Sequence, residues 1–216
     1  VTAGLGLDGG GRALAGRLLA GAAERWGRER GGGQAEVLAL SGGEAPGLSL
    51  PVASFGGSRA ALARELWRRQ ALANGPRPAV VYDLLGLSRA LAVLPPALQG
   101  PSAIVLLGIE VWRPLSPLHE RALRQAETVV SISRHTLQRA EPFLPALRRP
   151  AIVHPLCLEE RPPEGAVDLE LVARAGSGFL LTVGRMSASE RYKGHDAVLE
   201  VLPELARRHP GMRWVV

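Results

Sequence analysis

The sequence predicts an α/β protein with a mostly parallel sheet and flanking helices. Short apolar runs alternate with amphipathic helical patterns along the 216 residues, and several runs are continuous, as expected for strands buried on both faces. With 46% hydrophobic residues, the chain has ample material for a core. The strands are expected at residues 36–40, 79–84, 103–108, 128–131, 151–154 and 179–183.

Helical patterns lie between these strands. The first is expected to begin near Arg12, with an apolar stripe at i, i+4 spacing formed by Leu14, Leu18, Ala22 and Trp26. Residues 59–73 repeat this spacing. Ser133 is expected to cap a helix that begins at Arg134, because its hydroxyl can accept from a free backbone N–H. Another helix is expected over residues 195–207.

A domain boundary is expected in the polar, proline-rich segment 159–165. We therefore expect a domain over residues 1–165 and the beginning of a second over 166–216. The second starts with a strand, a loop, a helix and a strand at 214–216, which is the opening of another Rossmann-like unit. Because strand-like runs lie at both ends of the chain, we expect a fragment of a longer protein, with its second domain truncated.

Composition narrows the classes of partner. The net charge is +6, but the basic residues are spread along the chain and aromatic residues make up only 4%, so nucleic acid is not expected as a partner. Cys157 is the only cysteine, which excludes an internal disulfide and a cysteine-based zinc site. No apolar run approaches the ~20 residues of a membrane span. We expect a cytoplasmic protein, with peripheral contact at the inner face of an anionic membrane left open.

Lys193 is the only lysine among 26 basic residues. Lysine differs from arginine where a compact ammonium must reach one oxygen or phosphate. Together with Arg185, it lies between the expected strand 179–183 and the expected helix 195–207. Ligands of open α/β sheets bind beyond the carboxyl ends of strands, and helix N-termini attract anions, so this loop suits a diphosphate. The alternative is an exposed basic loop without a ligand.

A glycine-rich segment occupies the start of the chain. Residues 4–9 match G-x-G-x-x-G, and Gly10 and Gly11 follow directly before the first helix. Such glycines let backbone N–H groups approach a phosphate. A dinucleotide site would also need an acid at the end of the second strand, and Glu44 comes too late for that. The alternative is a tight turn between strand and helix.

Residues 108–112, Gly-Ile-Glu-Val-Trp, follow the expected strand 103–108. Glu110 is therefore expected either to hold a hydroxylated substrate or to bond the backbone of its own loop. The five histidines lack the spacing of a metal site, and the chain has neither an Asp-x-Asp pair nor a G-x-S-x-G elbow. We expect no metal, and these patterns identify no catalytic residue.

Residues 179–186 and 191–196 resemble the entry to the donor domain of glycosyltransferase family 4. Other segments resemble this family in the same order. Gly10-Gly11 is similar to its N-terminal Gly-Gly loop, residues 108–112 to its "H-G-x-E" region, residues 129–134 to its strand and helix start, and residues 152–155 to its "hydrophobic-x-H/N-P" element.

The resemblance implies a GT-B fold, in which two Rossmann-like domains face each other across a cleft. The N-terminal domain would hold a glycan or lipid-linked acceptor, and the C-terminal domain a nucleotide-diphosphate sugar. Arg185 and Lys193 would bind the donor diphosphate, and Gly10 and Gly11 would face the same phosphates. Transfer would retain the anomeric configuration, without a metal or other cofactor.

The chain departs from the family pattern at three places. Leu107 stands where the family often has histidine, and Leu156-Cys157-Leu158 replaces its usual glycine and aspartate. The family's E-x7-E element would lie beyond Val216, so we expect the fragment to be inactive alone. Three other classes stay open: a nucleotide-sugar epimerase with the same diphosphate loop, a non-catalytic scaffold favoured by Leu107, and a nicotinamide dehydrogenase, which lacks its ribose acid.

Overall fold

The computed structural model describes residues 1–6, 10–30, 34–42, 47–157, 169–176, 178–184 and 186–216. The chain forms two compact units, Val1–Glu159 and Glu160–Val216. We expected domains over 1–165 and 166–216; the proline-rich segment between them lies outside the described residues. Both units are α/β with parallel strands, which confirms the predicted fold class and is compatible with a Rossmann-like arrangement.

The first unit is built on parallel strands. Their bounds are β1 Val37–Ala39, β2 Val52–Ser54, β3 Val80–Tyr82, β4 Ser102–Leu106, β5 Thr128–Ser131 and β6 Ile152–Val153. β1 pairs with β2, and β3, β4, β5 and β6 pair in that order. All expected strands of this unit are found. β2 was not predicted, because three residues without a regular pattern around them give no periodic signal.

The N-terminal segment, residues 1–3, joins the β1–β2 pair to the β3–β6 group of strands. The Thr2 N–H donates to the Leu38 carbonyl, and Thr2 forms a parallel bridge with Ala39. On the other side, the Asp83 N–H donates to the Val1 carbonyl. The order is therefore β2, β1, the N-terminal segment, β3, β4, β5 and β6. All strands are parallel, but the strand order reverses between the N-terminal segment and β3: β1 and β2 are added on one side and β3 to β6 on the other. Doubly wound sheets bind ligands at such a position.

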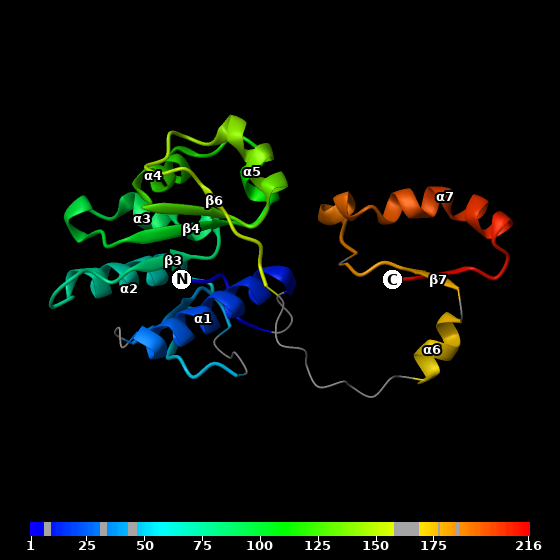
Figure 1. Cartoon of the computed structure of the whole chain (residues 1–216), viewed down its shortest axis with the longest axis horizontal. Helices are drawn as coiled ribbons and strands as arrows, with labels where there is room; N and C mark the ends of the chain where they lie inside the picture. Colours follow the sequence, from blue (N-terminus) through cyan, green and yellow to red (C-terminus); the bar gives the residue numbers. More distant parts are fainter. Residues whose placement is uncertain (7–9, 31–33, 43–46, 158–168, 177, 185) are drawn as a thin grey trace. The chain divides into compact units, whose positions relative to one another are not determined.

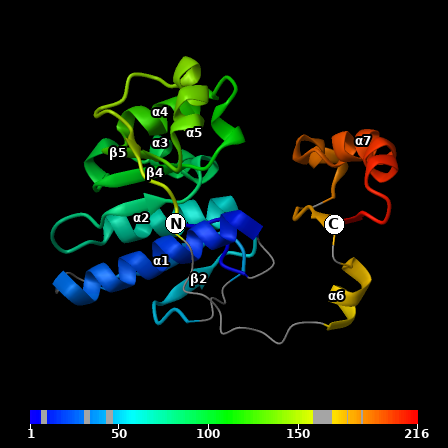
Figure 2. The same cartoon turned by 45° about the vertical axis from the view of Figure 1, so that its right-hand side comes forward.

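Helices cover both faces of this sheet. They are α1 Gly10–Arg30, α2 Arg59–Ala71, α3 Arg89–Val93, α4 Pro117–Gln125 and α5 Arg134–Ala140. Short 3-10 turns are η2 Leu85–Leu87, η3 Pro96–Leu98, η4 Ile109–Val111 and η5 Glu141–Phe143. In Figures 1 and 2, α1 lies on one side of β3 and β4, and α3, α4 and α5 lie on the other. The Ser133 hydroxyl accepts from the Thr136 N–H at 3.0 Å, which confirms the predicted cap of α5.

α1 is confirmed as a helix, but its buried face is not the expected apolar stripe. Ala13, Gly16 and Ala20 are buried, whereas Trp26 is 59% exposed. Small residues let the helix axis approach the strands closely, and i, i+4 spacing of large side chains does not reveal that contact. The helix also begins at Gly10 rather than near Arg12.

The second unit is a small β–α–β arrangement. Its elements are α6 Leu169–Ala175, β7 Phe179–Leu181, η6 Ala188–Lys193, α7 His195–Arg208 and β8 Arg213–Val215. β7 and β8 pair in parallel, and the Trp214 indole N–H donates to the Thr182 hydroxyl at 2.9 Å. The strand, helix and strand expected from the sequence are thus confirmed. This order places η6 and the N-terminus of α7 beyond the carboxyl end of β7.

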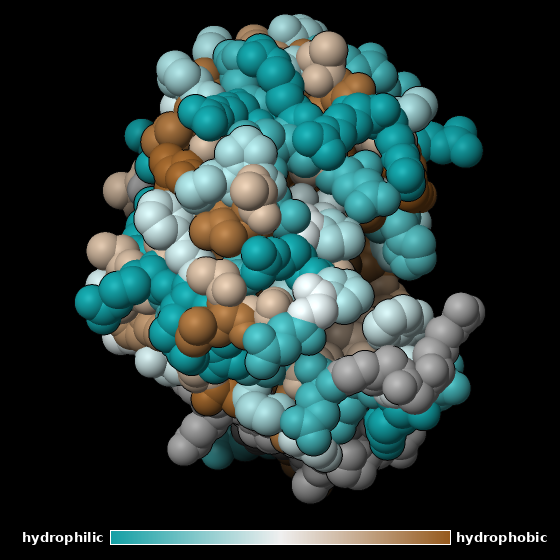
Figure 3. Space-filling model, turned by 90° about the vertical axis from the view of Figure 1, so that its left-hand side faces the viewer, coloured by the Kyte–Doolittle hydropathy of each residue, from teal (hydrophilic) through white to brown (hydrophobic). Residues whose placement is uncertain are grey.

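Most of the core lies between the first unit's sheet and helices. Its largest fully buried side chains include Tyr82, Leu85, Ile104, Leu106 and Leu123. On the face seen in Figure 3, hydrophilic residues predominate and apolar residues form small separate groups. None of the helices in the described part of the chain is long and apolar enough to cross a membrane.

Candidate functional site

The carboxyl ends of the first unit's parallel strands gather polar groups at one edge of the sheet. Asp83 follows β3, Glu110 follows β4, His135 follows β5 and His154 follows β6. Gly4 and Gly6 follow the N-terminal segment. Gly10 and Gly11 open α1, and both are exposed, with no other atom within 4 Å of the position a Cβ would take. Their backbone is therefore accessible to a ligand, as the diphosphate hypothesis requires.

The loop between the N-terminal segment and α1 is fixed by α1 itself. The Arg17 guanidinium donates to the Leu5 carbonyl at 3.1 Å and to the Gly6 carbonyl at 3.2 Å. The Ser41 hydroxyl, beyond β1, donates to the Ala3 carbonyl at 3.1 Å. These bonds hold Gly4 and Gly6 in place; residues 7–9, which complete the G-x-G-x-x-G pattern, lie outside the described residues. The described part of the loop is a positioned turn beside the N-terminus of a long helix.

Asp83 follows β3, at the point where the strand order of the sheet reverses. The sequence analysis did not single it out. It is 3% exposed, and its Oδ2 accepts a 2.5 Å hydrogen bond from the Thr2 hydroxyl. Its Oδ1 is buried without a hydrogen-bond partner among the described residues. Burial raises the pKa of this carboxyl, and the bond from Thr2 opposes that rise. The available signal was a single aspartate inside an otherwise apolar run, residues 79–85.

Glu110 bonds the backbone of its own loop. Its Oε1 accepts from the Leu107 N–H at 2.6 Å, across the turn from β4 into η4. The carboxylate is half-buried. Of the two expectations for Glu110, the structure shows the loop bond, while a contact with a substrate stays a prediction. The bond orients residues 107–110.

We predict that Glu110→Ala lowers the free energy of unfolding of the first unit by about 1.5–3 kcal/mol, the usual worth of a hydrogen bond to a charged group. Glu110→Gln keeps an amide oxygen for the Leu107 N–H, so its cost should be smaller. Hydrogen exchange of the Leu107 amide measures both variants. Equal protection in Glu110→Ala and the parent would contradict the loop role. If glutamine preserved stability but removed activity, the carboxylate would also serve a substrate.

Trp112 anchors the same loop to α5. Its ring meets the His135 ring edge-on at a centroid distance of 5.5 Å, and the Arg139 guanidinium lies 5.0 Å from its centroid. Cation–π and edge-to-face contacts of this kind favour a fixed ring position. Through these contacts, the motif 108–112 connects the loop after β4 to α5, the helix that follows β5.

Lys193 lies where the sequence analysis placed it, between a strand and a helix N-terminus. It ends η6, directly before α7. Its Cδ lies 3.9 Å from the position that a Cβ on Gly184 would take, and the His195 ring is nearer still, at 3.6 Å. The Lys193 stem thus lies beside the chain that leaves β7. The Lys193 side chain is exposed, and its Nζ lies 5.3 Å from the Tyr192 ring centroid.

The N-terminus of α7 carries two features suited to an anion. Gly194 precedes the helix at φ 82°, a conformation that glycine adopts without strain, and as the N-cap residue it supplies no side-chain hydrogen bond to the first turn. Asp196 in that turn pairs with Arg191 at 2.6 Å, so its negative charge is balanced locally. Lys193 precedes this positive end of the helix dipole by two residues.

His195 adds a buried polar group at this position. It is 9% exposed, and its Nε2 has no hydrogen-bond partner among the described residues. The ring also lies 6.3 Å from that of Trp214, centroid to centroid. The sequence analysis gave His195 no role, because nothing in its local pattern signals burial beside β8.

Arg185, the second cation expected at the diphosphate, lies outside the described residues. The structure therefore brings Lys193, Gly184 and the start of α7 together in the second unit, and Gly10 and Gly11 to the start of α1 in the first. Within the described residues, no three His, Cys, Asp or Glu side chains gather as a metal site would require.

Comparison with known proteins adds no family assignment. No protein-family model matches the chain, and no curated protein matches it either.

Proposed function

We propose that this chain belongs to a retaining glycosyltransferase, which moves a sugar from a nucleotide-diphosphate sugar to a glycan or lipid-linked acceptor. Lys193 and Arg185 would bind the donor diphosphate, and Gly10 and Gly11 would face the same phosphates. The observation that carries the proposal is the position of Lys193. The only lysine of the chain lies beside the segment that leaves β7, and it directly precedes Gly194, the N-cap of a 14-residue helix.

The chemistry of this proposal is electrostatic. When the sugar leaves, negative charge grows on the diphosphate, and an ammonium close to a helix N-terminus would stabilise it. No residue of the chain needs to form a covalent bond with the donor in this step. The domain arrangement of a GT-B fold belongs to the same proposal. A GT-B enzyme of this kind would hold its acceptor on the first unit.

The test is nucleotide-diphosphate release by the native protein that contains this chain, with a panel of UDP-, GDP- and ADP-sugars and a mixed acceptor extract. We expect release from one donor class, dependent on acceptor. Conversion of the sugar to an isomer without acceptor would favour the epimerase. No turnover of any donor would favour the non-catalytic scaffold and count against the proposal.

A further inference from the structure

A cavity of about 250 Å³ lies in the first unit, away from the glycine loop. α2, the η2–α3 segment and α4 form its walls. These elements begin just beyond β2, β3 and η4, so the cavity belongs to the carboxyl-end side of the sheet. None of its lining residues belongs to the glycine loop.

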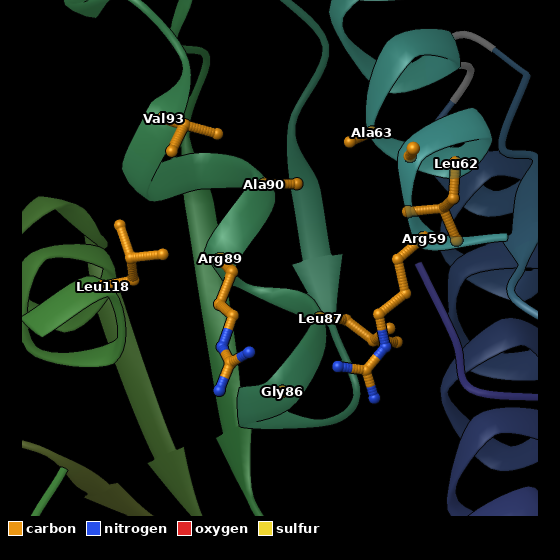
Figure 4. A pocket seen from close by; sticks show the side chains of 10 residues that line it. Arg59, Leu62, Ala63, Gly86, Leu87, Arg89, Ala90, Val93 and Leu118 are labelled. Carbon is orange, nitrogen blue, oxygen red and sulfur yellow. The ribbon is translucent and has the colours of Figure 1, made fainter. Parts of the chain in front are cut away.

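The cavity is apolar at one end and cationic at the other. Its apolar lining includes Leu62, Leu87, Val93 and Leu118. Arg59, the first residue of α2, and Arg89, the first residue of α3, also line it. In Figure 4 both guanidinium groups point to the same end, on either side of Gly86, and the Leu87 side chain lies next to Arg59, while Ala63 and Val93 lie toward the opposite end.

The two arginines have no acidic partner among the described residues. On α2, the helix that Arg59 begins, two other arginines do have an acidic partner: Arg68 and Arg69 each pair with Glu65 at 2.7 Å. Arg89 donates to the ring nitrogen Nε2 of His119, at 2.9 Å. Two cations without a carboxylate, beside an apolar lining, are an arrangement that a charged ligand would complete.

The pKa of His119 is also affected by the positive charges around the cavity. Burial lowers the pKa of the His119 imidazole below its ordinary value. The charges of Arg89, Arg113 and Arg59 lower this pKa further. A neutral imidazole can accept the hydrogen bond from Arg89, so His119 positions that guanidinium.

We propose that this cavity binds a lipid phosphate, a single apolar chain that ends in a phosphate monoester. A phosphate monoester carries about −1.5 to −2 charges at neutral pH, which two guanidinium groups match. A carboxylate would leave one cation unbalanced. The chain would lie along Leu87, Val93 and Leu118, with the phosphate between Arg59 and Arg89.

The volume limits how much of the ligand is enclosed. Complete sites for drug-sized ligands measure roughly 300–1,000 Å³, so a cavity of about 250 Å³ holds the phosphate and only the nearest part of the chain. The rest of the chain would leave between Val93 and Leu118, which are 46% and 40% exposed. Identifying this ligand as the sugar acceptor rests on the proposed function; the binding itself does not.

The test is calorimetric titration of the 216-residue chain with butyl, hexyl and octyl phosphate below their micelle concentrations, without nucleotide sugar. We expect the affinity to rise about fourfold per buried methylene and then to level off. Inorganic phosphate and octanol should each bind at least tenfold more weakly than octyl phosphate. Equal binding of inorganic phosphate or of octanol would overturn the proposal, as would the absence of binding.

Variants locate the binding. Arg59→Ala and Arg89→Ala should each weaken octyl phosphate binding about tenfold or more, the loss expected for one charge-assisted contact. Val93→Asp should weaken it as well, and this exposed position tolerates a polar side chain. Arg64→Ala is the matched control, because Arg64 is an exposed arginine of α2 that does not line the cavity. An equal loss in Arg64→Ala would show attraction to net charge only and would contradict the site.

The experiment separates this proposal from the proposed function. Binding without any donor turnover would support the lipid phosphate site and leave the glycosyltransferase proposal to its own test. Donor turnover without alkyl phosphate binding would overturn the site alone. If vesicles of phosphatidylcholine with phosphatidylglycerol bound the chain while octyl phosphate did not, a membrane surface would replace the single lipid as the partner.

Discussion

Replacing Lys193 with alanine is expected to reduce nucleotide-diphosphate release by the native protein about 100- to 1,000-fold, the usual effect of removing one donor from charge stabilisation in a transition state. The side chain is exposed, so its loss should leave folding unchanged. Because the diphosphate gains charge as the sugar leaves, kcat should fall by a larger factor than the donor KM rises.

Two further variants define what Lys193 contributes. Lys193→Arg keeps the charge but replaces a compact ammonium with a planar group, so we expect only partial activity. Arg174→Ala removes a positive charge from α6, which leads into the opposite end of β7, and should have little effect. Unchanged turnover in Lys193→Ala would contradict the role assigned to Lys193. A similar loss of turnover in Arg174→Ala would show that only the net charge matters.

Gly16→Ala should destabilise the first unit by about 1–3 kcal/mol, as expected for overpacking a filled site. An added Cβ would lie 2.5 Å from the Thr2 hydroxyl oxygen and 3.0 Å from Asp83 Oδ2. These atoms share a buried hydrogen bond and cannot separate without leaving Asp83 less satisfied. The preference of helices for alanine, worth about 1 kcal/mol, offsets only part of this cost.

Gly21→Ala in the same helix is the matched control. There an added Cβ meets only a Leu48 methyl, at 3.8 Å, which is ordinary contact. This substitution should stabilise α1 by about 0.5–1 kcal/mol. Hydrogen exchange of the Ile104 and Val105 amides in β4 reports the opening free energy of the unit in both variants. If Gly16→Ala were as stable as Gly21→Ala, α1 would not pack as closely against Thr2 and Asp83 as described.

Local signals in the sequence were sufficient for most strands and for helices α1, α2, α5 and α7, but not for β2, α3, α4 or α6. The cap at Ser133 was predictable because it involves a residue only three positions away. The position of Lys193 was predictable for a similar reason, since a strand, a loop and a helix follow one another within 30 residues. The bond between Glu110 and the Leu107 N–H is also local, and one of the two expectations for Glu110 contained it.

Contacts between distant residues were beyond such signals. Thr2 and Asp83 are 81 positions apart and meet only because the N-terminal segment pairs beside β3. The buried face of α1 follows from that arrangement, since Gly16 lies over the same pair. Arg59, Arg89 and Leu118 surround one cavity because the connections after three different strands meet there.

The sequence by itself thus determined the α/β class, most strands and the location of the only lysine, because periodicity and capping depend on neighbouring residues. The tertiary structure alone decided the burial of Asp83, the packed face of α1 and the arginine-lined cavity. Strand order sets which distant side chains share a space, and burial then sets their charge and their available partners.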